Sequence, residues 1–317
     1  MKLLIYIPAF NEAENIQQVI AALPRQLAGI DQVNTLVVDD GSTDRTAELA
    51  RSASASVVVH YKNRGVGAAF RSAVQFALEH DADLLVSIDA DGQFNPLEIS
   101  LLVAPILADR ANMVVGNRFE KGKPENMPGL KFWGNKKVTG IISSISGQKF
   151  TDVSCGFRAY DREALLRLNV FGDFTYTHES ILSLLYQGLR VEEVPVSVYY
   201  DTARKSRVAG SISNYAWQTS KIILRMLLNY RPLRVFGTTG AILIGIGGLF
   251  ELFLFIYYVV AGSFTPYKAA GFIGLGFILF GMLVLLIALI SDMLNRLRIN
   301  MDQQLYETKK MRYDNRR

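Results

Sequence analysis

Two long apolar stretches, residues 236–260 and 270–294, lie in the last third of the 317-residue chain. Each is about 25 residues long, so as a helix each would extend about 37 Å, enough to cross the ~30 Å hydrocarbon layer of a bilayer. Their only charged residues are Glu251 and Asp292. A buried helix of a soluble protein is seldom so long and so poor in charge. The pattern therefore predicts two transmembrane helices, joined as a hairpin over residues 233–295.

Basic residues flank this predicted hairpin on its two outer sides. Arg234 precedes the first span and Arg296 and Arg298 follow the second, whereas the link between the spans holds only Lys268. The positive-inside rule then places both outer flanks, including a basic tail over residues 296–317, in the cytoplasm. The N-terminus shows no signal-peptide pattern, so we expect it to be cytoplasmic as well. These features predict an integral protein of the inner (cell) membrane with both termini in the cytoplasm.

The chain carries a formal net charge of +5, and its basic clusters lie beside apolar segments. This placement favours a membrane surface over nucleic acid as the partner. Residues 213–232 fit that interpretation, because Trp217 and Met226 combine with Lys221 and Arg225 in an amphipathic helical pattern. The segment is either a surface helix packed on the preceding domain or a helix in the lipid interface. Its position beside a span favours the interfacial helix.

Glu251 lies inside the first apolar stretch, where an ionisable side chain is costly and is a candidate for function. The second stretch offers no basic residue at the matching depth. We therefore expect Glu251 to be protonated and hydrogen-bonded at a helix–helix contact, outside the chemistry of the protein. Small residues nearby, such as Gly245 and Gly248, would let two helices approach closely. Such a contact between protomers would make the protein a homo-oligomer.

Residues 1–212 alternate between strand-like apolar runs and helical patterns. Strands are expected at residues 3–7, 35–38, 57–61, 84–88 and 112–115, with helices between them at 16–23, 43–52, 66–80 and 97–108. Short links between alternating strands and helices predict right-handed β-α-β units and a mainly parallel sheet, which is an α/β fold. Ligands of such sheets bind beyond the carboxyl ends of the strands. That is where this sequence places Asp39, Asp40, Asp89 and Asp91.

The segment VSIDADGQF, residues 86–94, ends a buried strand with two carboxylates. Asp and Gly after a strand can simply make a turn. Alternatively, Asp89 and Asp91 are two residues apart on an extended chain, so both side chains face the same way and can bind a hard divalent cation. The chain has one cysteine, and its three histidines fit no local ligand spacing. Any metal is therefore expected to have oxygen ligands, which favours Mg²⁺ or Mn²⁺.

Short motifs recur in a fixed order along the first half of the chain. They are IPAFNEAENI (7–16), VVDDGSTD (37–44), NRGVGAAF (63–70), SIDADGQF (87–94), VVGNRF (114–119) and TDVSCGFRAY (151–160). In order and spacing they resemble the family 2 glycosyltransferases with the GT-A fold. Downstream, VEEVPVSV, RVAGSIS and YRPLRVFG before the apolar hairpin resemble the polyprenyl-phosphate glycosyltransferases. That group includes the dolichol-phosphate mannose synthases and bacterial undecaprenyl-phosphate glucosyltransferases.

The resemblance implies a Rossmann-like GT-A domain over residues 1–212 and names residues that would bind a nucleotide sugar. Some match positions that contact the base and ribose, namely Pro8, Ala9, Glu12 and Asp39. Others match the surroundings of a metal ion that holds the diphosphate, namely Asp89, Asp91 and Gln93, with Asp91 the strongest match. Asp40 is either on the ligand side or a turn former.

The acceptor implied by the resemblance is a polyprenyl monophosphate. Arg118 and Arg207 match phosphate-binding positions, and Lys131 is a weaker match because the family often has Arg there. Asp152 matches an acid near the transferred sugar, which would orient sugar hydroxyls or act as a base. Glu179 departs from the Glu-Asp pair of many family members, so a structural role is equally open. Asp91, Asp152, Arg118 and Arg207 form the predicted catalytic set.

The function implied is inverting transfer of one sugar, from UDP-glucose or GDP-mannose, to a polyprenyl monophosphate at the cytoplasmic membrane face, an EC 2.4.1 activity. One alternative is a non-catalytic, membrane-tethered nucleotide-sugar sensor or scaffold, against which the retained Asp89, Asp91 and arginines argue. The other is a processive polysaccharide synthase. Against that stand the absence of a Gln-x-x-Arg-Trp motif from the sequence and the small number of predicted spans.

Overall fold

The computed structural model describes residues 1–169, 176–200, 220–221, 224, 228 and 232–314. Contacts divide the chain into two compact units, Met1–Thr219 with Asp302–Arg317, and Ser220–Met301. The first unit contains the α/β domain and the end of the last helix, and the second contains most of two long apolar helices.

The α/β unit is built on a seven-stranded, mostly parallel sheet with the order β3-β2-β1-β4-β6-β5-β7. The strands are β1 Lys2–Ala9, β2 Gln32–Asp39, β3 Ser56–Val59, β4 Leu84–Ser87, β5 Met113–Asn117, β6 Arg158–Asp161 and β7 Val191–Pro195. Only β6 is antiparallel to its neighbours, β4 and β5. The predicted α/β class with a mainly parallel sheet is therefore confirmed.

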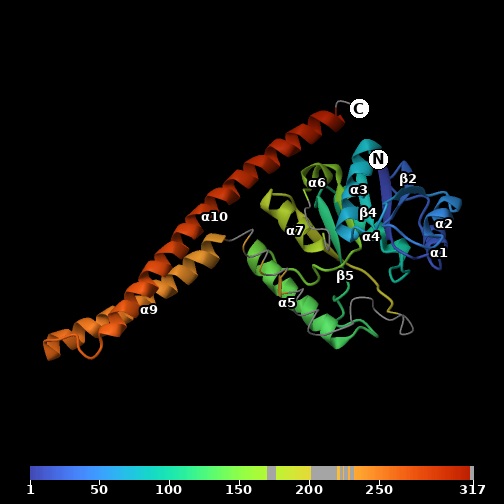
Figure 1. Cartoon of the computed structure of the whole chain (residues 1–317). Coiled ribbons are helices and arrows are strands. Elements are labelled where there is room, and N and C mark those ends of the chain that lie inside the picture. Colours follow the sequence, from blue (N-terminus) through green and yellow to red (C-terminus); the bar gives the residue numbers. More distant parts are fainter. Residues whose placement is uncertain (170–175, 201–219, 222–223, 225–227, 229–231, 315–317) are drawn as a thin grey trace. The chain divides into compact units, whose positions relative to one another are not determined.

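Helices connect the strands and pack on the sheet. They are α1 Ile16–Ala22, α2 Thr46–Ser52, α3 Val66–Glu79, α4 Ile99–Leu107, α5 Gly129–Ser146, α6 Arg162–Arg167 and α7 Thr177–Tyr186, with a short 3₁₀ turn, η1 Pro96–Glu98, before α4. Helices α1 and α2 contact each other near the β2 side of the sheet, and α5 contacts α7 (Figure 1). Helix α4 continues through Pro105, whose ring is buried.

Register places the ends of the central strands together. Ala9, the last residue of β1, is paired with Asp39 at the end of β2, and Tyr6 is paired with Ser87 at the end of β4. The interior residues of these strands, such as Ile5, are fully buried. The polar loops that follow β1, β2 and β4 therefore leave the core at the same edge of the sheet, as expected for a parallel sheet.

The apolar unit contains α9 Pro232–Ala261 and the first part of α10 Lys268–Asp314. Both helices are long and apolar enough to cross a membrane, which suggests that they anchor the protein. They pack as a pair through glycines: a Cβ atom on Gly247 would lie 2.6 Å from the carbonyl oxygen of Gly274. A Cβ on Gly274 would in turn lie 2.8 Å from Glu251 Oε1. Glu251 thus lies against α10, at a contact between the two helices of one chain.

The end of α10 belongs to the α/β unit and packs on α6. The Tyr306 hydroxyl donates a hydrogen bond to Glu163 Oε2 at 3.2 Å, and Lys309 Nζ donates to the carbonyl oxygen of Leu168 at 2.7 Å. The Arg167 guanidinium lies 4.2 Å from the centre of the Tyr306 ring. The sequence predicted a basic tail over residues 296–317. The structure shows that this tail is helical up to Asp314.

Candidate active site

Two carboxylates follow the buried strand β4. Ile88 is still buried, and the chain then turns through Asp89, Ala90 and Asp91 to Gly92, whose φ is +71°. The turn is closed locally, because the Gln93 backbone N–H donates to Asp91 Oδ1 at 3.1 Å. The segment therefore makes a turn, so Asp89 and Asp91 do not lie on an extended chain as the sequence suggested, but the charge of Asp91 still acts on Asp89.

Asp89 lies in a crowded and poorly solvated position. A Cβ atom on Gly156 would lie 3.2 Å from each of its carboxylate oxygens, so residue 156 has to be small. Burial, together with the charge of Asp91, raises the pKa of Asp89 to about 7, although Arg118, Lys131 and Arg158 act in the opposite direction. Two acids that repel each other at low dielectric are a favourable place for a divalent cation.

The donor set fits Mg²⁺ or Mn²⁺. Asp89 and Asp91 offer carboxylate oxygens, and Gln93 offers an amide oxygen, which are the ligands that hard cations prefer. Within the described part of the chain, no cluster of three or more His, Cys, Asp or Glu side chains could hold a metal by itself. The site therefore suits an ion that shares its coordination with substrate phosphates and water, as Mg²⁺ commonly does.

The carboxylate pair opens into a cleft of about 790 Å³. The cleft is lined by the loop after β1, one side of α1, the turn after β4 and the exposed side chain of Tyr199. Of the predicted site residues, Glu12, Asp89, Asp91 and Gln93 line it. Pro8, Ala9 and Asp39 end the neighbouring strands β1 and β2 and are not among its lining residues.

The loops after β1 and β2 are joined by hydrogen bonds. Asn11, with φ +54°, accepts from the Thr43 backbone N–H at 2.9 Å, and the Glu12 N–H donates to Thr46 Oγ1 at 2.9 Å. Glu12 Oε2 accepts from Asn15 Nδ2 at 3.0 Å. These contacts fix Glu12 at the edge of the cleft before any ligand binds.

Asp39 and Asp40 point to different partners at the end of β2. Asp39 Oδ1 accepts from the Ser42 backbone N–H at 2.9 Å. Asp40 accepts from the backbone N–H groups of Arg64 and Gly65 at 3.0 and 2.7 Å, and its Oδ1 lies 2.7 Å from His60 Nδ1. The geometry of Asp40 is that of a residue that fixes a loop, here the loop before α3.

Arg118 and Asp152 lie together, next to a second, smaller cavity. Arg118 Nε and Nη2 donate to the two oxygens of Asp152 at 2.6 and 2.9 Å, and Nη1 donates to the Tyr200 hydroxyl at 3.1 Å. Burial by itself would raise the pKa of Asp152, but the Arg118 guanidinium and its hydrogen bonds lower it. A carboxylate held in this way is a weak base, so the geometry favours positioning over proton transfer.

Lys131, in the first turns of α5, is placed above Tyr200, with Nζ 5.1 Å from the ring centre. Burial and the nearby positive charge of Arg118 lower the pKa of Lys131. Arg207, with the neighbouring Arg204, lies outside the described residues, as does most of the predicted interfacial helix over 213–232. Glu179 lies in the first turn of α7.

Sequence reasoning missed Arg158, which is fully buried on β6. Its guanidinium donates to the carbonyl oxygens of Val153, Cys155 and Thr177 at 2.6–2.7 Å. These bonds hold the segment that carries Asp152 and presents Gly156 to Asp89. The only signal in the sequence was the position of this arginine in the motif TDVSCGFRAY.

His178 was also missed. It is buried on α7, and neither ring nitrogen has a hydrogen-bond partner among the described residues. Burial, with the charge of Arg158, lowers the pKa of His178 to about 3, so the ring is neutral. The sequence context THES gave no indication that this imidazole is inside the domain.

Comparison with known proteins now identifies the family. Residues 4–168 match the family described as glycosyl transferase family 2. The chain belongs to this family. Among the relatives of this glycosyltransferase is AglJ of Haloferax volcanii, 30% identical over 298 residues that cover 92% of each chain. A UDP-N-acetylglucosamine–dolichyl-phosphate N-acetylglucosaminyltransferase of Methanococcus voltae is 29% identical over 248 residues, covering 71% of this chain and 95% of the relative.

Solved structures show the fold of this family 2 glycosyltransferase. Glucosyl-3-phosphoglycerate synthase from Mycobacterium tuberculosis, in complex with Mn²⁺, UDP-glucose and phosphoglyceric acid, superimposes with a TM-score of 0.54. The superposition covers 69% of this chain and 78% of the synthase at 23% identity. The predicted GT-A architecture of the α/β domain is therefore confirmed.

Proposed function

We propose that this glycosyltransferase transfers a single sugar from a nucleotide sugar to a polyprenyl monophosphate at the cytoplasmic face of the membrane. The observation that carries the proposal is the Asp89–Asp91 pair in a large cleft of a family 2 domain whose chain also has two long apolar helices. The Methanococcus voltae relative adds support, since the name of that enzyme specifies a nucleotide sugar and a dolichyl phosphate. A soluble acceptor would need no such helices.

The reaction is a single displacement at the anomeric carbon. An anionic oxygen of the acceptor phosphate forms a bond to C1 of the sugar as the bond from C1 to the β-phosphate oxygen of the donor breaks. The bonding electron pair leaves with the nucleoside diphosphate, and the configuration at C1 is inverted. A divalent cation bound at Asp89, Asp91 and Gln93 supplies Lewis-acid stabilisation of the leaving diphosphate.

The residues of the chain bind and orient the two anions. Because the attacking oxygen is already charged, proton abstraction is not required, and the main task is to bring the reactants into line. We assign the acceptor phosphate to Lys131 and, from its motif, Arg207. From their motifs we assign Arg118 to phosphate binding and Asp152, its ion-pair partner, to the transferred sugar. Glu12 and Asp39 are assigned to the ribose and base of the donor.

Transfer of label from donor to lipid tests the proposal. The detergent-purified protein is incubated with Mn²⁺ or Mg²⁺, undecaprenyl phosphate and labelled UDP-glucose, GDP-mannose or UDP-N-acetylglucosamine. Label is expected in the organic phase with one donor, to be lost on adding EDTA and in Asp91→Asn. Asp31→Asn, an exposed acid before β2, serves as the matched control and should transfer normally. Metal-dependent nucleotide binding without transfer from any donor would favour the sensor or scaffold.

A further inference from the structure

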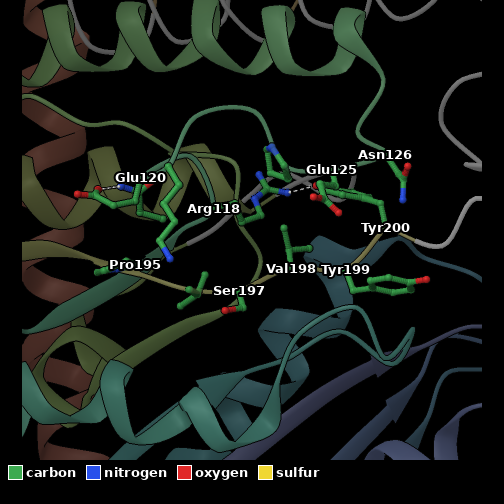
Figure 2. A pocket seen from close by; sticks show the side chains of 13 residues that line it. Arg118, Glu120, Glu125, Asn126, Pro195, Ser197, Val198, Tyr199 and Tyr200 are labelled. Carbon is green, nitrogen blue, oxygen red and sulfur yellow. Dashed lines mark hydrogen bonds between the residues drawn. The ribbon is translucent and has the colours of Figure 1, made fainter.

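A second cavity, of about 330 Å³, lies between the loop after β5 and the segment after β7. In Figure 2, Glu125 and Asn126 come from the loop on one side, and Ser197, Val198 and Tyr199 come from the segment on the other. Tyr199 lines both this cavity and the cleft of the carboxylate pair. The two spaces therefore adjoin at one aromatic side chain that is 69% exposed.

The walls of this cavity are held by contacts within the domain. Phe119 and Met127, near the two ends of the loop, are buried in a small apolar cluster with Tyr200. Asn117 donates to Glu120 Oε2 and accepts from the Phe119 backbone N–H, both at 2.9 Å. On the other side, the Tyr199 N–H donates to the carbonyl oxygen of Gln93 at 2.9 Å. A preformed cavity of this size is at the small end of the ~300–1,000 Å³ range of ligand pockets.

The charges around the cavity argue against an anionic ligand. Arg118 is the strongest cation of its described lining, but Asp152 balances that charge through two hydrogen bonds. Of the other charged side chains that line it, Glu120 and Glu125 oppose the single ammonium of Lys121. The described lining therefore carries net negative charge, which repels a phosphate but not a neutral ligand.

The same lining suits a neutral polyol. Carboxylate and amide oxygens of Glu125 and Asn126 accept hydrogen bonds from hydroxyl groups, and charged acceptors form the stronger bonds. The Ser197 hydroxyl both donates and accepts. The exposed Tyr199 ring offers an apolar face with a polar tip, against which the carbon-bound hydrogens of a pyranose can pack. One monosaccharide fits these features better than a longer glycan or an isoprenoid chain.

We propose that this cavity binds the sugar of the donor and that Glu125, Asn126 and Tyr199 select which sugar is accepted. The diphosphate then lies in the adjoining cleft at Asp89 and Asp91, and Tyr199 lies beside the junction of the two groups. The inference rests on the proposed function only in requiring that the donor is a nucleotide sugar. It concerns binding alone, so it can be tested without the lipid acceptor.

Calorimetric titration compares each nucleotide sugar with its nucleoside diphosphate in the presence of Mn²⁺. For Glu125→Gln, we expect the affinity for the accepted nucleotide sugar to fall about 10- to 100-fold, as for a lost hydrogen bond to a charged group. The affinity for UDP or GDP should be unchanged. Glu125 is exposed, so this substitution is not expected to disturb folding. Glu79→Gln, at the end of α3, is the matched control and should bind both ligands normally.

A pair of variants tests the aromatic wall separately. Tyr199→Phe keeps the ring and should retain the affinity for the nucleotide sugar, whereas Tyr199→Ala should weaken it severalfold. Wild-type affinity for the nucleotide sugar in Glu125→Gln and Tyr199→Ala would overturn the cavity assignment and leave the proposed function intact. Equal losses for sugar nucleotide and free diphosphate would also overturn it. If the wild-type protein binds no nucleotide sugar at all, the proposed function fails and the assignment fails with it.

Discussion

Arg118 and Asp152 form a two-point ion pair inside the glycosyltransferase domain, with Nε–Oδ2 and Nη2–Oδ1 distances of 2.6 and 2.9 Å. Asp152 is fully buried and also accepts from the Ser154 hydroxyl at 2.9 Å. The pair joins the end of β5 to the segment before β6, which is the segment that places Gly156 against Asp89. A contact between residues far apart in sequence thus supports the geometry of the carboxylate pair.

Asp152→Asn tests this ion pair through stability. The substitution keeps the size of the side chain but leaves the buried Arg118 charge unbalanced, which typically costs about 3–5 kcal/mol. For a domain of this size, the melting temperature of the purified protein should fall by roughly 6–20 °C. Asp109→Asn removes an exposed partner of Arg190 and should change the melting temperature little. A melting temperature of Asp152→Asn equal to that of the wild type would contradict a structural role for the pair.

The raised pKa of Asp89, about 7, predicts that metal binding depends on pH. A metal ion binds the deprotonated carboxylate, so below pH 7 a proton must first be displaced. The affinity for Mn²⁺ should therefore fall about fivefold between pH 7 and pH 6, with release of a proton, and should level off above pH 8. Electron paramagnetic resonance of free Mn²⁺ would measure this. Asp89→Asn should bind more weakly and with a flatter pH dependence; an equally steep profile in that variant would exclude Asp89 as the titrating group.

Gly156→Ala tests whether the space beside Asp89 matters for the metal. The added methyl group would lie 3.2 Å from both carboxylate oxygens, so the carboxylate has to shift by a few tenths of an ångström. We expect a severalfold loss of Mn²⁺ affinity with little change in melting temperature. In Gly140→Ala, on α5, the new methyl group meets no atom within 4 Å, so metal binding should be unaffected. Equal metal affinities for the two variants would show that Asp89 tolerates displacement.

The glycine contact between α9 and α10 predicts a position-specific effect in the apolar hairpin. A methyl group on Gly247 would lie 2.6 Å from the Gly274 carbonyl oxygen and 2.7 Å from a side-chain carbon of Ile278, so Gly247→Ala has to push the helices apart. Overpacking of this kind costs about 1–3 kcal/mol. Gly245→Ala, whose methyl group meets nothing within 4 Å, is the control. Thermal unfolding in detergent should separate the two variants, and identical curves would argue against this packing.

Much of the domain could be predicted because its strands are short apolar runs that end in polar residues. The run that became β4 and the acids that follow it were located from the alternation of strand and helix patterns alone. Strand β6 was missed, because it has only four residues, Arg158–Asp161, and contains two charges in place of an apolar run. Its antiparallel position between β4 and β5 depends on tertiary contacts, and the periodicity of apolar residues along the chain does not predict it.

The site was partly predictable for the same reason. Asp89 and Asp91 are two residues apart in sequence, so they could be named as a pair, although they lie in the turn after β4 and not on an extended strand as expected. The pairing of Arg118 with Asp152, by contrast, depends on how β5 and the segment before β6 lie in the sheet. The family resemblance therefore identified both residues as candidates but not their mutual contact. The buried positions of Arg158 and His178 were hidden for the same reason.

The hydrogen bond from the Tyr199 N–H to the carbonyl oxygen of Gln93 joins the segment after β7 to the turn that carries the carboxylate pair. The loop after β5, on the opposite wall of the smaller cavity, is held instead by Asn117 and the cluster around Tyr200. One wall is thus tied to the turn that carries Asp89 and Asp91, and the other can vary in sequence without moving that turn. Exchanging residues 120–126 between relatives would then be a route to new donor preferences that leaves the metal-binding turn intact.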